Sequence, residues 1–137
     1  METLYQASVT ATAGREGTVK SSDGVLDFEV KMPTELGGKG GAFTNPEQLF
    51  AAGYSACFGG ALNLVALKSK IRLNDSSVTA VVGIGKTEGG LGLEVTMKAS
   101  MPGIEKEIAL DLLEKAHQVC PYSIATRGNI EVKLELI

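Results

Sequence analysis

The feature that most constrains this chain is a long apolar stretch that begins at its middle third. Asn45 suits a helix N-cap, Pro46 suits the first helical position, and Gln48 lies three residues after the cap. From Leu49 to Leu67 the residues are apolar nearly all the way round a helical wheel. The pattern predicts a long helix that starts at Asn45 and is buried on every side.

A run of this length is close to that of a membrane span. Glycines and polar side chains interrupt it, however, at Gly53, Ser55, Gly59, Gly60 and Asn63. We therefore expect a central core helix and no membrane contact. A helix that is apolar on every face must pack against other elements on every face, and the remaining elements of a 137-residue chain are too few to do so. We therefore also expect self-association around this helix.

The other elements follow from shorter patterns. Alternation of apolar and polar residues predicts two or three antiparallel strands in the first thirty residues, a hairpin of 77–86 and 91–99, and a last strand over 130–136. Residues 32–44 form a glycine-rich loop, and an amphipathic second helix follows Pro102 and ends at Pro121. We expect a single α+β domain over residues 1–137, with antiparallel β-sheets around a buried central helix in an intertwined homodimer.

Composition excludes several classes of function. A net charge of −3 and 21% charged residues leave no basic stripe for nucleic acid. The first five residues lack the features of a secretory signal, so we expect a reducing, cytoplasmic location. Cys57 and Cys120 lack CxxC spacing and His117 is the only histidine, which is too few ligands for a zinc site.

Taken singly, the residues that could carry chemistry have ordinary structural explanations. A cysteine within an apolar helix, such as Cys57, is more often a small core residue than a nucleophile, and the same holds for Cys120. Arg15 on a glycine-flanked turn is by default a solvated charge. Glu47 in the first turn of a helix is by default a favourable partner of the helix dipole.

Taken together, four motifs resemble the organic hydroperoxide resistance proteins. They are Gly14-Arg15, Glu35-Leu36-Gly37-Gly38, the stretch from Asn45 to Phe58 (NPEQLFAAGYSACF) and the stretch from Cys120 to Asn129 (CPYSIATRGN). The related osmotically inducible OsmC proteins share the fold and both cysteines, but Phe50–Tyr54 and Pro121–Ser123 favour the first branch. Ile124 departs from the family pattern, which has a polar residue such as asparagine there; the change affects the surroundings of Cys120 but removes no functional group.

This resemblance implies a thiol-dependent peroxidase with an OsmC-like fold. It assigns Cys57 as the peroxidatic thiol, Cys120 as the resolving thiol, Arg15 as the activating cation and Glu47 as the carboxylate that holds it. It further implies no bound cofactor and an external dithiol reductant, usually a lipoylated protein.

The residue types suit that chemistry. Burial raises the pKa of a thiol unless a cation is near, and an arginine is a cation that cannot be deprotonated. A sulfenic acid on one cysteine is protected when a second thiol converts it to a disulfide. A hydrophobic peroxide suits apolar surroundings, for which we name Leu49, Phe50, Tyr54 and Phe58 as candidate pocket residues.

The spacing of Glu47 and Cys57 raises a question of geometry. Ten residues of continuous helix separate them by about 15 Å and turn them about 80° away from a common face. Either the helix bends between Asn45 and Gly53, or Arg15 and Glu47 complete the site around Cys57 of the other subunit.

Two other functions remain as alternatives: a general peroxidase of the OsmC branch, and a non-catalytic dimeric protein that binds lipid or has a structural role. A Cys–His acyl transferase would need an oriented histidine, and we expect His117 to be a surface residue near a helix end.

Overall fold

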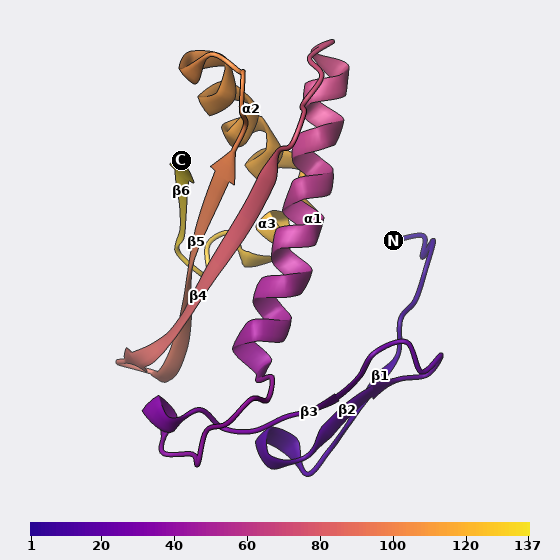
Figure 1. The fold of residues 1–137 in the computed structure, drawn as a ribbon, viewed down its shortest axis with the longest axis vertical. Coiled ribbons are helices and arrows are strands. Elements are labelled where there is room, and N and C mark those ends of the chain that lie inside the picture. The colour runs from indigo at the N-terminus through magenta and orange to yellow at the C-terminus, as the bar shows by residue number, and fades with distance from the viewer. The chain divides into compact units, whose positions relative to one another are not determined.

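The computed structural model describes all residues from Met1 to Ile137. The chain forms two compact units, Met1–Leu49 and Phe50–Ile137. Their elements follow in the order β1 (Val9–Thr12), a 3-10 turn (Gly14–Glu16), β2 (Thr18–Ser21), β3 (Asp27–Glu29), a 3-10 turn (Thr34–Leu36), α1 (Pro46–Lys68), β4 (Ser77–Thr87), β5 (Gly90–Ser100), α2 (Lys106–Val119), α3 (Pro121–Thr126) and β6 (Val132–Leu136). The expected α+β class is confirmed (Figure 1).

The first unit is a small antiparallel sheet in the order β1-β2-β3, followed by the glycine-rich loop. No side chain in these three strands is buried, and Phe28 is half exposed. Val30, which bridges to Thr44 just after β3, is the only buried apolar residue in this unit. The unit therefore has almost no hydrophobic core of its own within one chain.

The second unit holds the core. Strands β4 and β5 form the expected long hairpin, and β6 adds to the other edge of β5. The pairing of β5 with β6 is parallel, so this sheet is mixed and not purely antiparallel as expected. The chain reaches β6 through α2 and α3, and a crossover of this kind is what parallel neighbours require.

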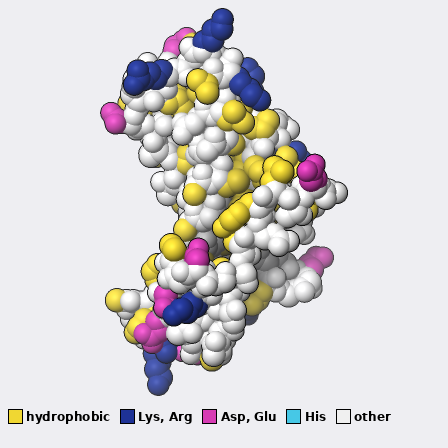
Figure 2. Space-filling model, turned by 90° about the vertical axis from the view of Figure 1, so that its right-hand side faces the viewer, with side chains coloured by type: hydrophobic (Ala, Val, Ile, Leu, Met, Phe, Trp, Pro, Cys, Tyr) yellow, Lys and Arg dark blue, Asp and Glu magenta, His cyan; other side chains and the backbone are white.

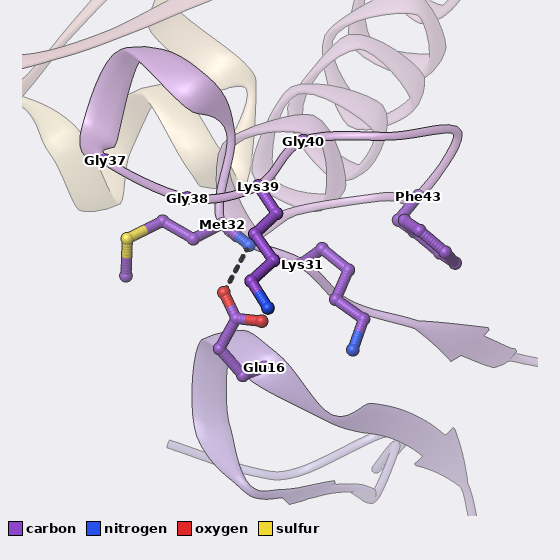
Figure 3. A pocket seen from close by; sticks show the side chains of 8 residues that line it. All are labelled: Glu16, Lys31, Met32, Gly37, Gly38, Lys39, Gly40 and Phe43. Atoms are coloured by element: carbon purple, nitrogen blue, oxygen red, sulfur yellow. Dashed lines mark hydrogen bonds between the residues drawn. The ribbon is translucent and has the colours of Figure 1, made fainter.

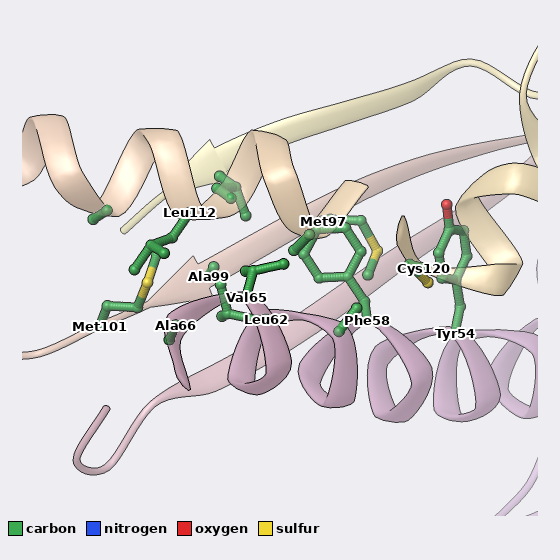
Figure 4. Packing of buried hydrophobic residues seen from close by; sticks show 14 of the residues in the cluster. Tyr54, Phe58, Leu62, Val65, Ala66, Met97, Ala99, Met101, Leu112 and Cys120 are labelled. Atoms are coloured by element: carbon green, nitrogen blue, oxygen red, sulfur yellow. The ribbon is translucent and has the colours of Figure 1, made fainter. Parts of the chain in front are cut away.

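Helices α1 and α2 pack on one face of this sheet (Figures 1 and 4). Along β5 the buried positions alternate as Val95, Met97 and Ala99, while the residues between them stay partly exposed. That two-residue period places one face of the strand against the helices and leaves the other open. Phe58 and Leu62 of α1 fill the space between helix and strand.

The start of α1 follows the sequence signals. The Asn45 side chain accepts a hydrogen bond from the Gln48 N–H at 2.8 Å, which satisfies one of the free amides at the helix terminus. The Gln48 side chain does not return to the cap, since its oxygen accepts from the Thr44 hydroxyl at 3.0 Å. The helix then runs from Pro46 to Lys68 without interruption.

One face of α1 stays open in the single chain. Six of its side chains are buried in the core, but the opposite stripe of Ala56, Gly60, Leu64 and Leu67 is exposed. Figure 2 shows hydrophobic side chains gathered where α1 lies. The helix also has the length and mean hydropathy, 1.4 over its most apolar window, that a membrane span requires, a test that core helices of soluble proteins also meet.

Candidate active site

The two cysteines lie together in the second unit. The Cys120 Sγ is 3.6 Å from the Cys57 Sγ, although the residues are 63 positions apart. Cys57 is half-buried on α1, whereas Cys120 is completely buried. Figure 4 shows Cys120 beside the rings of Tyr54 and Phe58. Cys57 is therefore the more accessible of the two thiols in the single chain, and Cys120 has no exposed surface.

Cys120 occupies a corner between two helices. It is the C-cap of α2 and the residue before α3, and its φ and ψ of −65° and 122° are extended. Pro121 forces this change, because it cannot continue α2 but suits the first position of a new helix. The six-residue α3 was not expected, since it is too short to show a period.

Gly53 brings α3 close to α1. A Cβ at this position would lie 3.1 Å from the Tyr122 hydroxyl oxygen, closer than most side-chain contacts. The Tyr122 ring packs on Tyr54 with a centroid separation of 5.6 Å. The missing side chain thus lets the turn that follows Cys120 lie against the turn of α1 that precedes Cys57.

The surroundings of Cys57 act on its pKa in opposite directions. Burial raises the pKa of the thiol, and the adjacent Cys120 thiol raises it further. The backbone N–H of Tyr122 opposes both by donating to the sulfur. The net effect raises the pKa of Cys57, so within this unit the neutral thiol is favoured at neutral pH. A cation near the sulfur would favour the thiolate.

Arg15 and Glu47 are paired in the first unit. Arg15 Nη1 and Nη2 donate to the two carboxylate oxygens of Glu47 at 2.9 and 2.7 Å. This bidentate geometry raises the pKa of Arg15 and lowers the pKa of Glu47, in both cases chiefly through the side-chain hydrogen bonds. About a third of the Arg15 side chain stays exposed, so the guanidinium keeps donors free for another group.

The turn that carries Arg15 is built from unusual backbone. Ala13 and Gly14 both have positive φ, at 57° and 55°. A Cβ on Gly17 would overlap the Thr12 carbonyl oxygen, so the turn closes only with glycine there. Glu16 fixes the turn to the next loop, because its carboxylate accepts the Met32 N–H at 3.1 Å (Figure 3).

That loop borders a hollow in the first unit. It has a volume of about 420 Å³ and is lined by Glu16, Lys31, Met32, Gly37, Gly38, Lys39, Gly40 and Phe43 (Figure 3). Lys31 lies 5.7 Å from the centre of the Phe43 ring. All of its lining residues belong to the first unit and none is a cysteine, so its size alone does not make it the site of thiol chemistry.

The residues named for a substrate pocket separate into two pairs. Tyr54 and Phe58 are fully buried in the core, and neither exposes surface to a ligand in the single chain. Leu49 and Phe50 are half-buried and keep accessible apolar surface. We therefore retain only Leu49 and Phe50 as candidate pocket residues.

His117 differs from the expectation of a surface residue. It is half-buried on α2, with its ring against Phe58 and its Nδ1 2.9 Å from the Ser123 hydroxyl. Burial lowers the pKa of His117, and the nearby charge of Arg127 adds to this shift. The structure contains no group of three or more His, Cys, Asp or Glu side chains that could hold a metal ion.

Comparison with known proteins matches residues 37–135 to the OsmC-like protein family. An organic hydroperoxide resistance protein of Xanthomonas axonopodis pv. citri is 54% identical over 97% of this chain and 94% of its own length. The crystal structure of such a protein from Elizabethkingia anophelis is 61% identical, with a TM-score of 0.93 over 99% of this chain and 98% of its own.

A further solved structure, OhrB of Bacillus subtilis, is 48% identical and has a TM-score of 0.90 over 98% of this chain and its full length. These similarities extend over both units and include the segments that carry the two cysteines and the Arg15–Glu47 pair. The chain belongs to the OsmC-like family and, within it, to the organic hydroperoxide resistance proteins.

Proposed function

We propose that this protein is a thiol-dependent peroxidase that reduces organic hydroperoxides to alcohols in the cytoplasm. The observation that carries the proposal is the pair of thiols 3.6 Å apart, one accessible and one buried. This difference in access supports the proposed roles, in which Cys57 meets the peroxide first and Cys120 reacts afterwards with the oxidised Cys57. The organic hydroperoxide resistance proteins to which the chain is similar support the substrate class.

The first step is attack of the Cys57 thiolate on the peroxide. The S–O bond forms as the O–O bond breaks, the alkoxide leaves, and one proton converts it to the alcohol. Cys57 is then a sulfenic acid. In this scheme Arg15, held by Glu47, stabilises the thiolate and donates to the peroxide oxygens, which offsets the raised pKa of the buried thiol.

The second step is capture of the sulfenic acid by Cys120. The S–S bond forms, the S–O bond breaks, and the hydroxyl leaves with the thiol proton as water. The sulfurs must approach from 3.6 Å to the bonded distance of about 2 Å. A dithiol such as a dihydrolipoyl group on a partner protein then reopens the bond by two thiol–disulfide exchanges and itself becomes the disulfide. No bound cofactor is needed.

We also propose that the working form is a homodimer. Support comes from two surfaces left uncovered in one chain: the apolar stripe of α1 and the strands β1 to β3, which bury no side chain. Gly60 lies on that stripe, and nothing in the chain is within 4 Å of a Cβ placed there. Glycine within a helix costs about 1 kcal/mol relative to alanine, and close approach of a second helix would give a reason for it.

Light scattering tests the dimer directly. Gly60→Glu should convert a dimer to monomer, because the new side chain has room in one chain and none against a second helix. Gly85→Glu is the matched control, since Gly85 is equally open but lies on β4. Equal masses for wild type and Gly60→Glu would contradict a dimer built on this stripe.

The spacing of Glu47 and Cys57 on the uninterrupted helix α1 favours a site shared between subunits. In that arrangement Arg15 and Glu47 serve Cys57 of the partner. Mixing Cys57→Ser with Glu47→Ala should then restore activity, because each heterodimer contains one site with all four residues intact. Verified heterodimers that stay inactive would rule the sharing out.

The activity itself is tested with cumene hydroperoxide and hydrogen peroxide, with dihydrolipoamide as reductant. Wild type should consume the organic peroxide faster than hydrogen peroxide, and Cys57→Ser should lose the reaction. Cys120→Ser should complete one turnover and then stop, which separates the two thiol roles. Equal rates with both peroxides would favour a general peroxidase of the OsmC branch. No turnover above Cys57→Ser would favour the non-catalytic lipid-binding or structural protein.

A further inference from the structure

A chain of buried hydroxyl groups lies behind the cysteine pair. The Tyr54 hydroxyl is 3.0 Å from the Ser123 Oγ and 3.2 Å from the Thr126 Oγ1. The Ser123 Oγ is also 2.9 Å from His117 Nδ1. Ser123 and Thr126 are the only buried polar side chains of the protein besides the tyrosine, and no buried side-chain polar atom lacks a partner.

The donor-to-acceptor direction of these hydrogen bonds follows from the last hydroxyl in the series, that of Thr126. The Thr126 hydroxyl donates to the Tyr122 carbonyl at 2.9 Å, and a carbonyl can only accept. Thr126 must then accept from Tyr54, and Tyr54 must accept from Ser123. Because Ser123 has used its one hydrogen, it accepts from His117, whose Nδ1 therefore carries a proton. The order is His117 to Ser123 to Tyr54 to Thr126, and each hydroxyl donates once and accepts once.

These hydrogen-bonded groups lie on both sides of the corner that carries Cys120. His117 is three residues before Cys120 on α2, and Ser123 is three residues after it on α3, so their hydrogen bond closes the corner. A second bond across the corner runs from Arg127 Nη2 to the His117 carbonyl at 2.8 Å. Tyr54, three residues before Cys57, fixes the corner to α1.

We propose that Tyr54, Ser123, His117 and Thr126 are positioning residues for the resolving step, holding the Cys120 corner against Cys57 so that the sulfenic acid is captured before a second peroxide arrives. This inference rests on the proposed function. None of the four touches the peroxide in this scheme. Their loss should therefore slow disulfide formation and leave the first attack on the peroxide unchanged.

The test is a single turnover of the reduced protein with one equivalent of cumene hydroperoxide, followed by alkylation at set times and intact mass. Tyr54→Phe keeps the ring and removes the hydroxyl. We expect peroxide consumption at the wild-type rate and disulfide formation slowed roughly tenfold, the effect of losing one buried hydrogen bond. With excess peroxide, Tyr54→Phe should accumulate Cys57 sulfinic acid, which the wild type avoids.

Thr126 offers a matched pair of variants. Thr126→Val keeps the shape and removes the hydroxyl, whereas Thr126→Ser keeps the hydroxyl. Thr126→Val should behave like Tyr54→Phe, and Thr126→Ser like wild type. If a variant were only less stable but still folded, peroxide consumption and disulfide formation would not change separately. Wild-type rates of disulfide formation in both Tyr54→Phe and Thr126→Val would overturn the inference.

A second oxidant keeps the inference independent of peroxidase activity. The Cys57 thiolate attacks oxidised glutathione, whose S–S bond breaks to release one glutathione thiol and leave a mixed disulfide. Cys120 then attacks the Cys57 sulfur, and the mixed disulfide breaks to release the second glutathione thiol as the Cys57–Cys120 bond forms. The same variants should close the Cys57–Cys120 bond more slowly in this reaction. Nitrogen chemical shifts of the His117 ring should further show the proton on Nδ1 at neutral pH, and a proton on Nε2 alone would contradict the direction of the chain.

Discussion

The thiol pair and the ion pair are held by different means. Cys57 and Cys120 lie in the hydrophobic core of the second unit. There Phe58, Leu62 and Met97 each expose at most 1% of their surface. Arg15 and Glu47 belong to a unit with a single buried apolar residue, Val30, and are joined by their own hydrogen bonds. Packing fixes the sulfurs, whereas charge and a strained turn fix the guanidinium.

The two pairs thus rely on different physical forces: close packing holds the sulfurs, and charged hydrogen bonds hold the guanidinium. In the proposed mechanism two sulfurs bond to each other and need a fixed spacing, which close packing supplies. The proposed cation meets a group that changes from thiolate to peroxide to disulfide, and it needs hydrogen-bond donors that stay free. The exposed third of the Arg15 side chain provides them.

The largest difference should appear in stability. Phe58→Ala should lower the free energy of unfolding by about 3–5 kcal/mol, because it opens a cavity in the core. Phe28→Ala, at a half-exposed side chain of β3, should cost less than about 1 kcal/mol in a single chain, and more where the proposed dimer covers this sheet. Urea denaturation of both variants measures the two values. A loss at Phe28 as large as that at Phe58 would mean that a partner subunit covers this sheet.

The next effect concerns Arg15. Arg15→Ala should slow oxidation of Cys57 roughly a hundredfold at neutral pH, because without the cation the raised pKa leaves little thiolate. Raising the pH should restore part of the rate in this variant as the thiol ionises. Stopped-flow consumption of cumene hydroperoxide from pH 6 to about 10 measures both curves. Parallel pH profiles for wild type and variant would assign Arg15 no part in ionising the thiol.

Removal of the Glu47 carboxylate should slow the oxidation of Cys57 less than removal of Arg15 does. Glu47→Gln keeps a hydrogen-bond acceptor for Arg15 but no charge, so we expect a loss of roughly tenfold at neutral pH. Since the pKa of Glu47 is lowered in the folded protein, its ion pair contributes fully above the ordinary glutamate pKa of about 4.3 and is lost as pH falls through the lowered value.

The Glu47→Gln variant should therefore lack this acid-dependent loss of stability, which thermal unfolding between pH 3 and about 6 can follow. Glu16→Gln is the control, since Glu16 accepts a backbone N–H and pairs with no cation. Identical acid transitions in wild type and Glu47→Gln would show that the pair does not survive in solution.

The smallest effect concerns the backbone of the Arg15 turn. Ala13 has a left-handed conformation with φ of 57°, which costs an L-residue with a Cβ about 1 kcal/mol. Ala13→Gly should therefore stabilise the protein slightly, by less than about 1 kcal/mol after the entropy of glycine is counted. Urea denaturation checks the sign, and a clear loss of stability would mean that the Ala13 methyl makes a contact in the working assembly.

Local patterns predicted most of the fold. Asn45 and Pro46 marked the start of α1, and alternation marked the β4–β5 hairpin, because these signals depend on neighbours along the chain. The parallel pairing of β5 with β6 depends on residues far apart in sequence and was missed. Pro121 was correctly assigned as the end of α2, yet the same proline also suits the start of α3.

The site divided in the same way. Motif resemblance named the cysteines and the ion pair as candidate site residues, and the structure places the two members of each pair in contact. It named Tyr54 and Phe58 beside Leu49 and Phe50, because an all-apolar helix does not reveal which face meets the core. The hydroxyl chain through His117 was missed because its members lie on three elements and become neighbours only after folding.

The separation of 63 positions between the two cysteines has a thermodynamic consequence. When the bond closes, it joins α1 to the end of α2 and encloses β4 and β5 in a covalent ring. The chain-entropy treatment of such a ring gives a stabilisation of about 4 kcal/mol over the open form. In the proposed cycle the protein would therefore alternate between a less stable reduced form and a more stable oxidised form, and the reductant would act against that difference each time it restored the thiols.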